Sequence, residues 1–369
     1  MEKTKRDLIQ ESLSKQIMDN NMWGIAHVAP RVGKIKITLN CLKPKDKVII
    51  VYPETNIKTS WVNDIKKWKF KSKNIKYSTS KSFKKVKDPC DVLVLDEIHT
   101  LSENQISDVV RYINTHKITK VIGLSGTISE ETRINLETRL KLKIVVNYSI
   151  ESAIDDGVIT DYRIIVVTTP LSTDKNIKVK WKGGEFYTSE KQSFDRLTAK
   201  IGDLSTPAKS LKMLRLTRMS IIKKSQSKIK KTKDILSKLD KQRVLVFTGL
   251  TEVADSLGIA SYHSKSPNEV TKLDFLNGRI DKMAIVNKLN TGVTYTNLNT
   301  AIINFFDSNA ENMAQKISRI TCMEYNNPDK VANIIIICSE EEVEKRWLTK
   351  SLSFFDQNKI TWTKTYDGR

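Results

Sequence analysis

The segment Asp91–Leu101 reads DVLVLDEIHTL, and it decides the fold class expected for this chain. Its apolar part, Val92–Leu95, consists of valine and leucine only, as is typical of a strand buried on both faces of a parallel sheet. Two adjacent carboxylates, Asp96 and Glu97, follow at once. Because ligands of parallel sheets bind beyond the carboxyl ends of the strands, this position predicts a polar site. One carboxylate can hold Mg²⁺ there while its neighbour polarises water; two acids that cap a following helix are the alternative.

A phosphate-binding loop is expected upstream, in the segment His27–Ile37, HVAPRVGKIKI. An apolar run ends there, and Pro30 and Gly33 precede Lys34 at the start of a predicted helix. Backbone N–H groups and the helix N-terminus would face the phosphates, and Lys34 would reach the β and γ oxygens. The usual pattern has a Ser or Thr after the lysine as a Mg²⁺ ligand, and Ile35 stands in that place. The predicted nucleotide-binding residues of the loop are Ala29, Pro30, Arg31, Val32, Gly33, Lys34 and Ile35.

Short apolar runs alternate with helix-like stretches over two parts of the chain, which predicts buried parallel strands joined by crossover helices. The runs of the first part are Gly24–Ala29, Lys47–Tyr52, Asp91–Leu95, Val121–Leu124 and Ile144–Val146. Those of the second part are Val244–Thr248, Met283–Val286, Ala301–Phe306 and Asn333–Ile337. We therefore predict an N-terminal α/β domain over 1–162, an insertion and basic helical connector over 163–240, a second α/β domain over 241–345, and a helical tail over 346–369.

The chain is strongly basic. Lys plus Arg number 63 against 42 Asp plus Glu, a formal net charge of +21. The excess is concentrated in Lys66–Lys87, where aromatic residues are interleaved, and in Lys209–Arg243. Such segments suit a groove that follows backbone phosphates and stacks bases, so we expect a nucleic-acid partner. A solvated lysine-rich face, enlarged by an AT-rich genome, is the alternative.

Other classes of protein are not favoured. No apolar run is near the length of a membrane span, and the charged N-terminus MEKTKRDLIQ is unlike a secretory signal. The four cysteines have no CxxC spacing and the four histidines are scattered, so we expect no zinc site. Reduced thiols in a cytoplasmic protein are the simplest interpretation.

Several segments of the first part resemble motifs of superfamily 2 helicases. Asp96–His99, DEIH, resembles motif II, and Leu124–Thr127, LSGT, resembles motif III. Val51–Trp68 is similar to motif Ia and its helix in Swi/Snf-type and phage DNA helicases. Arg6 and Gln10 stand where that superfamily places its adenine-recognition residues.

The second part continues the resemblance. Arg243–Gly258 resembles motif IV, Ala284–Ile303 motif V and Ala314–Ile320 motif VI. Motif VI departs from the pattern at Ser318, which replaces a glycine, and at Cys322, which replaces the final arginine. The resemblance implies an α/β protein of two RecA-like domains, each a parallel sheet flanked by helices, with a cleft between them that binds ATP and Mg²⁺.

The resemblance also implies roles for individual residues. Those with catalytic roles are Lys34, Asp96, Glu97, Gln315 and Arg319, of which Asp96 and Glu97 would hold the metal. Those added to the nucleotide site are Arg6, Gln10 and Gly292. Those that couple ATP state to movement are Ser125, Gly126 and Thr127. Those that contact nucleic acid are Pro53, Glu54, Thr55, Trp61, Thr248 and Thr291.

The expected function is that of an ATP-dependent helicase or translocase, an ATP hydrolase acting on DNA rather than RNA in replication, recombination or repair. The AT-rich composition and compact size suggest a phage or another mobile element. Two alternatives stay open, a nucleotide-gated DNA-binding subunit with little ATPase activity and an RNA helicase.

Overall fold

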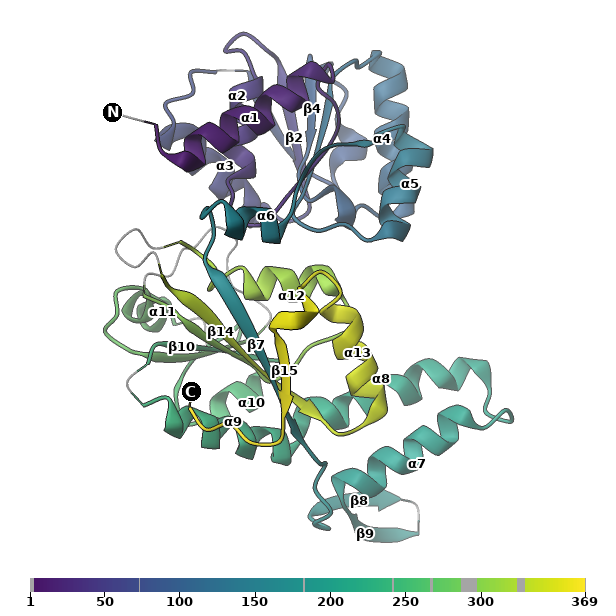
Figure 1. The fold of residues 1–369 in the computed structure, drawn as a ribbon. Coiled ribbons are helices and arrows are strands. Elements are labelled where there is room, and N and C mark those ends of the chain that lie inside the picture. The colour runs from purple at the N-terminus through teal and green to yellow at the C-terminus, as the bar shows by residue number, and fades with distance from the viewer. Residues whose placement is uncertain are drawn as a thin grey trace. The chain divides into compact units, whose positions relative to one another are not determined.

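The computed structural model describes residues 3–72, 74–181, 183–240, 242–265, 268–286, 297–323 and 329–368. The chain divides into two compact units: the first runs to Thr160 and also takes in the described residues Thr321–Met323, and the second begins at Asp161. Each unit is built on one parallel sheet flanked by helices (Figure 1). The prediction of an α/β protein with two such sheets is confirmed.

The sheet of the first unit has the strand order β3-β2-β4-β5-β1-β6, and every neighbouring pair is parallel. Its strands are β1 (Trp23–Val28), β2 (Val48–Tyr52), β3 (Ile75–Thr79), β4 (Val92–Leu95), β5 (Val121–Ser125) and β6 (Ile144–Tyr148). All residues of β2, β4 and β5 are buried, which explains their continuous apolar runs. The edge strand β3 was not predicted, because it lies in a lysine-rich segment and is only half-buried.

Helices cover both faces of this sheet (Figure 1). One face packs against Leu13, Ile37 and Trp61, and the other against Val109 and Leu136. The helices of the first face are α1 (Lys5–Asp19), α2 (Lys34–Cys41) and α3 (Thr55–Lys67). Those of the second are α4 (Glu103–His116) and α5 (Glu130–Leu140), and α6 (Ile150–Asp155) follows β6. The short 3₁₀ turns η1 (Phe83–Lys85) and η2 (Ile98–Thr100) flank β4 along the chain.

The sheet of the second unit has the order β11-β12-β10-β13-β14-β7-β15 and is also parallel throughout. Its strands are β7 (Asp161–Thr169), β10 (Val244–Thr248), β11 (Ala260–Tyr262), β12 (Lys282–Val286), β13 (Thr300–Ile303), β14 (Val331–Ser339) and β15 (Ile360–Thr363). Its helices are α9 (Gln226–Lys238), α10 (Thr251–Ser256), α11 (Glu269–Leu276), α12 (Ala310–Ile317) and α13 (Glu342–Ser351), with η3 (Gln357–Lys359) before β15.

Two parts of this sheet differ from the sequence-based expectation. All of β7 after Tyr162 lies in the interval 163–240 assigned to insertion and connector, yet the strand pairs with β14 over its whole length. The tail 346–369, expected to be helical, completes α13 and then adds β15 as an edge strand beside β7. In both cases the strand is identified by a partner that is distant in the sequence.

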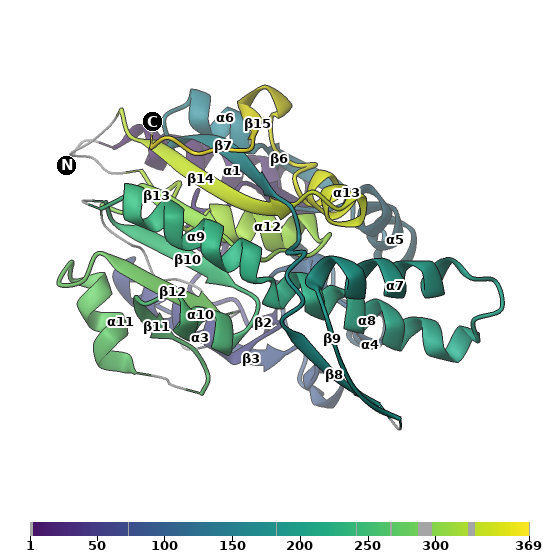
Figure 2. The same ribbon diagram turned by 90° about the horizontal axis from the view of Figure 1, so that it is seen from below.

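An insertion between β7 and α9 forms what we call the arm. It consists of the antiparallel hairpin of β8 (Ile177–Trp181) and β9 (Gly184–Thr188), followed by α7 (Glu190–Gly202) and α8 (Ala208–Lys224). Figure 2 shows α7 and α8 side by side, pointing away from the sheet of this unit. The base of the arm is held by Glu190, only 3% exposed, whose carboxylate accepts hydrogen bonds from Ser172 N (3.2 Å), Ser225 Oγ (2.9 Å) and Gln226 N (2.5 Å).

No helix in the described part of the chain is long and apolar enough to cross a membrane. All four cysteines are free and buried. Burial raises the pKa of the Cys41 thiol to about 12, so this thiol is protonated at neutral pH.

A buried ion pair joins α9 to α13 in the second unit. The Lys228 ammonium and the Glu344 carboxylate are paired, with their side chains 1% and 0% exposed. Glu344 also accepts a hydrogen bond from the backbone N–H of Ser339 (2.7 Å). The ammonium lies 5.3 Å from the ring centre of Phe306. The pair therefore connects two helices to the end of β14.

Replacing one partner should be more harmful than replacing both. Lys228→Met leaves a carboxylate buried without its cation, and we expect it to lower the free energy of unfolding by about 3–5 kcal/mol. The double variant Lys228→Met/Glu344→Leu should recover most of that loss, because it buries no charge. Urea unfolding followed by far-UV circular dichroism measures both. Equal stability of the wild type and the single variant would contradict a structural role for this pair.

Candidate nucleotide-binding site

The loop between β1 and α2 has the backbone of a phosphate-binding loop. Gly33 is the N-cap of α2 with φ of 106°, a left-handed conformation that favours glycine. A Cβ atom at Gly33 would also lie 2.4 Å from Gln10 Nε2, so a larger residue there would displace the Gln10 amide. No side chain caps the N-terminus of α2. Its first N–H groups are thus free of side-chain caps and suit an anion.

Lys34 and the two acids lie together at the carboxyl edge of the first sheet. Lys34 Nζ is 2.9 Å from Glu97 Oε1. The β4-β5-β1 order explains the meeting, because the carboxyl ends of these parallel strands point the same way. Burial, followed by the Glu97 carboxylate, raises the pKa of Asp96 to about 6, while the Lys34 ammonium and the indole of Trp61 act in the opposite direction.

Trp61 is the direct partner of Asp96. Its indole N–H donates to Asp96 Oδ2 at 2.8 Å, and the backbone N–H of Glu97 donates to the other carboxylate oxygen at 3.0 Å. The prediction that Trp61 contacts nucleic acid is wrong, since its side chain is 0% exposed. The sequence placed it correctly on the helix after motif Ia but did not show which face of that helix is buried. Pro53, Glu54 and Thr55, at the junction of β2 and α3, retain exposed surface.

Metal binding at this edge requires ligands beyond the protein. Among the described residues, no group of three or more His, Cys, Asp and Glu side chains is arranged to hold a metal ion. Two adjacent carboxylates fit Mg²⁺ that is also held by phosphates and water, since this ion usually keeps several waters. Ile35 offers no oxygen and packs against the apolar cluster of the α1–α3 face. Thr38 does not replace it, because its buried hydroxyl donates to Lys34 O at 2.9 Å.

Two residues of α1 lie against the loop. Gln10 Nε2 donates to Val32 O at 2.7 Å, and Arg6 Nε donates to the same carbonyl at 3.3 Å. The Arg6 guanidinium also binds Arg31 O. Gln10 is 3% exposed, and its Oε1 has no hydrogen-bond partner in the described structure. A buried acceptor of this kind is rare unless a ligand or water completes it.

The predicted coupling segment approaches the loop and reaches Glu97 through His99. A Cβ atom on Gly126 would lie 3.1 Å from Pro30 Cγ and 3.2 Å from Lys34 Nζ, so the segment closely approaches the loop. Ser125 Oγ is 2.9 Å from His99 Nδ1, and that nitrogen is 3.5 Å from Glu97 Oε2.

His99 therefore connects Glu97 to Ser125, although it was not among the predicted site residues. Its only signal in the sequence is the fourth position of DEIH. The Ser125 hydroxyl continues the chain of contacts to Thr127 O.

The remaining predicted residues follow Thr160 in the chain. Gln315 lies near the end of α12 and Arg319 just beyond it, both half-buried. Cys322 is 7% exposed, and its carbonyl accepts from Thr160 Oγ1 at 3.0 Å, so it is a packing residue where the helicase pattern has an arginine.

Thr248, predicted to contact nucleic acid, is 3% exposed, and its hydroxyl lies 3.2 Å from both Leu250 O and Ile285 O. Its side chain is thus unavailable for that contact. Thr291 and Gly292 lie outside the described residues.

Comparison with known proteins identifies relatives of the fold. No protein-family model matches the sequence, and no curated protein matches it either. Dbp5 of S. cerevisiae bound to RNA and ADP BeF3 is similar over 96% of this chain and 89% of its own, with a TM-score of 0.61 and 12% identity. The Hef helicase domain of Pyrococcus furiosus is similar over 94% and 99%, with a TM-score of 0.55 and 12% identity.

A third structure, the ATP-dependent type ISP restriction-modification enzyme LlaBIII bound to DNA, is similar over 98% of this chain. Only 31% of that enzyme is covered, with a TM-score of 0.59 and 12% identity. These similarities show the fold, and the expectation of two RecA-like domains is confirmed.

The hydrogen bond from Trp61 to Asp96 makes a prediction about metal-dependent nucleotide binding. Trp61→Phe keeps a buried aromatic ring but removes the indole N–H that donates to Asp96 Oδ2. A hydrogen bond to a charged group is worth about 1.5–3 kcal/mol, so we expect a comparable loss of stability and weaker Mg²⁺-dependent binding of a fluorescent ATP analogue. Trp68→Phe, on the C-cap of the same helix, is the matched control. Wild-type binding and stability of Trp61→Phe would show that the bond does not position Asp96.

Proposed function

We propose that this protein is an ATP-dependent helicase or translocase that hydrolyses ATP and moves along DNA. The observation that carries the proposal is the ion pair of Lys34 and Glu97 beside the buried carboxylate of Asp96, at the end of a phosphate-type loop. Burying the Asp96 carboxylate beside a second carboxylate, the partly exposed Glu97, is costly unless cations accompany them. A nucleotide with Mg²⁺ would supply those charges and explain why the acids are kept.

The pairing of Lys34 with Glu97 suggests how binding prepares hydrolysis. Phosphates on the α2 N-terminus compete with Glu97 for the Lys34 ammonium. As Lys34 turns to the β and γ oxygens, the Glu97 carboxylate is released to orient the attacking water. Asp96, held by Trp61, would be a ligand of Mg²⁺. The ion would neutralise charge on the phosphate oxygens.

Adenine selection is assigned to α1. The Gln10 Oε1 atom, which has no partner in the described structure, can accept a hydrogen bond from the amino group of adenine. Beside it, Arg6 donates hydrogen bonds to the loop carbonyls of Val32 and Arg31. Ser125–Thr127 would pass the state of the phosphates onward, because the segment touches both Lys34 and His99. The helicase resemblance assigns the second domain's contribution to Gln315 and Arg319, and movement along the strand to repeated closure and opening.

The partner is proposed to be DNA bound through its backbone. The net charge of +21 favours sequence-independent, salt-sensitive binding. The half-buried Pro53 and the exposed Glu54 and Thr55 follow β2 in the segment that resembles DNA-helicase motif Ia. One structural relative is bound to DNA and another to RNA, so RNA is a separate outcome of the test.

A second candidate is a nucleotide-gated DNA-binding subunit with little turnover. It is favoured by two residues that differ from the helicase pattern. Ile35 makes apolar contacts where the pattern has a Ser or Thr that binds the metal. Cys322 is buried where the pattern has an arginine that contacts the γ-phosphate.

The first experiment compares phosphate release by the wild type and by Lys34→Ala, with and without single-stranded DNA or RNA. We expect DNA-stimulated release by the wild type and a loss of at least about 100-fold in the variant, because the lysine stabilises charge on the transferred group. Wild-type release no higher than that of Lys34→Ala, together with ATP-dependent DNA binding, would support the gated subunit instead. Stimulation by RNA alone would indicate an RNA helicase.

Position 35 provides a gain-of-function test. Ile35→Thr restores a hydroxyl to the place where the helicase pattern has a Mg²⁺ ligand, so we expect faster hydrolysis at limiting Mg²⁺. Ile35→Val is the control, since it makes a similar change in volume without adding oxygen. If the two variants need the same Mg²⁺ concentration for half-maximal hydrolysis, Asp96 and water suffice for the metal.

A further inference from the structure

Helix α8 of the arm is the most one-sided charged element of the chain. The stretch from Leu204 to Lys224 contains no Asp or Glu. Its basic residues are Lys209, Lys212, Arg215, Arg218, Lys223 and Lys224. The helix itself spans Ala208–Lys224 and would be about 25 Å long at 1.5 Å per residue. It thus presents a dense positive surface on an element outside the second sheet.

Three of these cations have no ion-pair partner among the described residues. Lys209, Lys212 and Arg215 are exposed, and no carboxylate of a described residue lies within ion-pair distance of them. On the neighbouring α7, by contrast, Lys191 pairs with both Asp195 (2.7 Å) and Glu341 (3.1 Å). Six residues of helix separate Lys209 from Arg215, so the three charges lie along about 9 Å of the helix axis. Their mutual repulsion is relieved by a polyanion.

Apolar side chains share this side of the helix. Met213 and Leu216 are 66% and 45% exposed. They follow Lys209 at spacings of four and seven and Lys212 at one and four, which places all four on one side of α8. We call Lys209, Lys212, Met213, Arg215 and Leu216 the α8 face; Arg215, three residues after Lys212 and seven before Ile222, lies at its border with the packed side of the helix. It combines phosphate-binding cations with uncovered apolar contacts.

The opposite side of α8 is the side used for folding. Arg218 lies 5.6 Å from the ring centre of Phe194 on α7 and donates to Thr198 Oγ1 at 3.2 Å. Phe194 and Ile222 are 2% and 1% exposed in a small core of their own. Met213 and Leu216 are therefore not part of the packing between α7 and α8.

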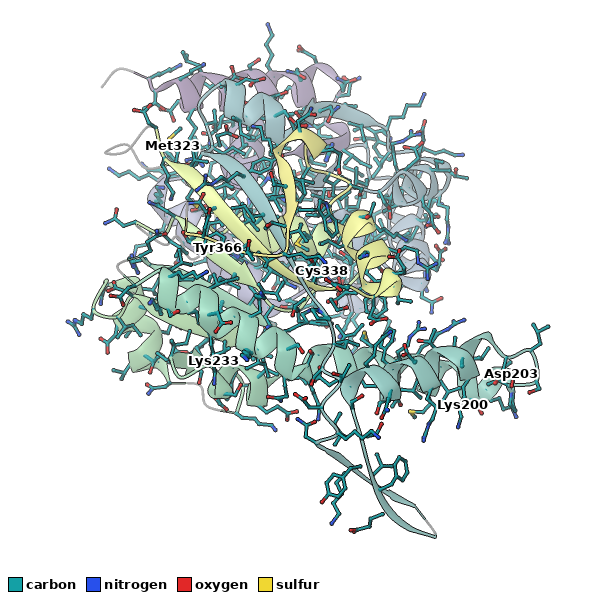
Figure 3. The ribbon with its side chains drawn as sticks, turned by 60° about the horizontal axis from the view of Figure 1, so that its bottom comes forward. Lys200, Asp203, Lys233, Met323, Cys338 and Tyr366 are labelled. Carbon is teal, nitrogen blue, oxygen red and sulfur yellow. The ribbon has the colours of Figure 1, made fainter. Side chains whose placement is uncertain are left out.

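The arm is anchored firmly to its own unit. Glu190 ties the starts of α7 and α9 together, and Lys224 pairs with Glu252 at 2.8 Å. Figure 3 shows Lys200 and Asp203 at the outer end of the arm, away from Cys338 in the sheet. A ligand on the α8 face would be held at a defined distance from that sheet.

We propose that the α8 face is a second nucleic-acid contact, which binds a single strand with its phosphates at Lys209, Lys212 and Arg215 and its bases against Met213 and Leu216. A single strand fits better than a duplex, because its base faces are free to cover apolar side chains. The proposal rests on the nucleic-acid partner of the proposed function, and it requires no ATP hydrolysis.

The test measures binding of a fluorescein-labelled 20-nucleotide oligothymidylate by anisotropy, without ATP, over a series of KCl concentrations. Lys209→Ala/Lys212→Ala/Arg215→Ala should bind at least about 10-fold more weakly. The slope of log K against log [KCl] should be shallower by about 2, since each neutralised phosphate of a single strand contributes about 0.7. Alanine preserves the helix at these exposed positions, which circular dichroism verifies.

The control removes three exposed cations of the same unit that lie outside Lys209–Arg243, Lys175→Ala/Lys265→Ala/Lys350→Ala. It should change the affinity and the salt slope much less. Equal losses in the two triple variants, or wild-type binding by the α8 variant, would overturn the proposal and leave the proposed ATPase untouched. Absence of strand binding by the wild type would instead remove the proposed function.

The apolar contacts are tested separately. Met213→Ser/Leu216→Ser should weaken oligothymidylate binding about 3- to 10-fold without changing the salt slope, because no charge is removed. Binding of a 20-base-pair duplex should be unaffected by this pair. A loss of the same size for duplex and single strand, or no loss for either, would overturn the assignment of bases to Met213 and Leu216.

Discussion

The contact between Lys34 and the acids Asp96 and Glu97 is the constraint on which the first unit depends. These groups come from segments far apart in the chain, and only the parallel β4-β5-β1 order brings them to one edge. Three neighbouring residues help to place them. Gly33 leaves room for the Gln10 side chain at the loop, and Gly126, just after β5, leaves room for the Lys34 side chain. Trp61 donates a hydrogen bond to one oxygen of Asp96. The site is therefore a property of the sheet edge rather than of one motif.

The second unit is organised by buried charges of another kind. Glu190 satisfies the N–H and hydroxyl groups at the base of the arm, and Lys228 with Glu344 joins two helices to the end of β14. Such groups are costly to bury unless every donor and acceptor has a hydrogen-bond partner. Each of them therefore restricts how the helices and strands around it can pack. The contacts that hold the base of the arm do not involve Lys209, Lys212 and Arg215 on α8. These cations can therefore stay exposed without weakening the attachment of the arm.

Continuous apolar runs made most of the two sheets predictable. Strands such as β2, β4 and β5 are buried on both faces, so their sequences are nearly continuous runs of apolar residues, mainly Val, Ile and Leu. The edge strand β3 is half-buried and lysine-rich, and it left no such signal. Most of β7 lies in the interval assigned to insertion and connector, and its place in the second sheet could not be known, because its partner β14 lies far along the chain.

The sequence by itself determined the α/β class, the loop with Lys34, the acid pair after β4 and the excess of positive charge. These follow from local patterns, in which strand ends, turn residues and charge are contiguous. The tertiary structure decided which of the remaining candidates belong to the site. It turned Trp61 from a surface contact into a buried donor to Asp96, and it made Cys322 a packing residue. Burial and hydrogen-bond partners depend on which face of an element meets its distant neighbours, and periodicity in one segment does not specify that.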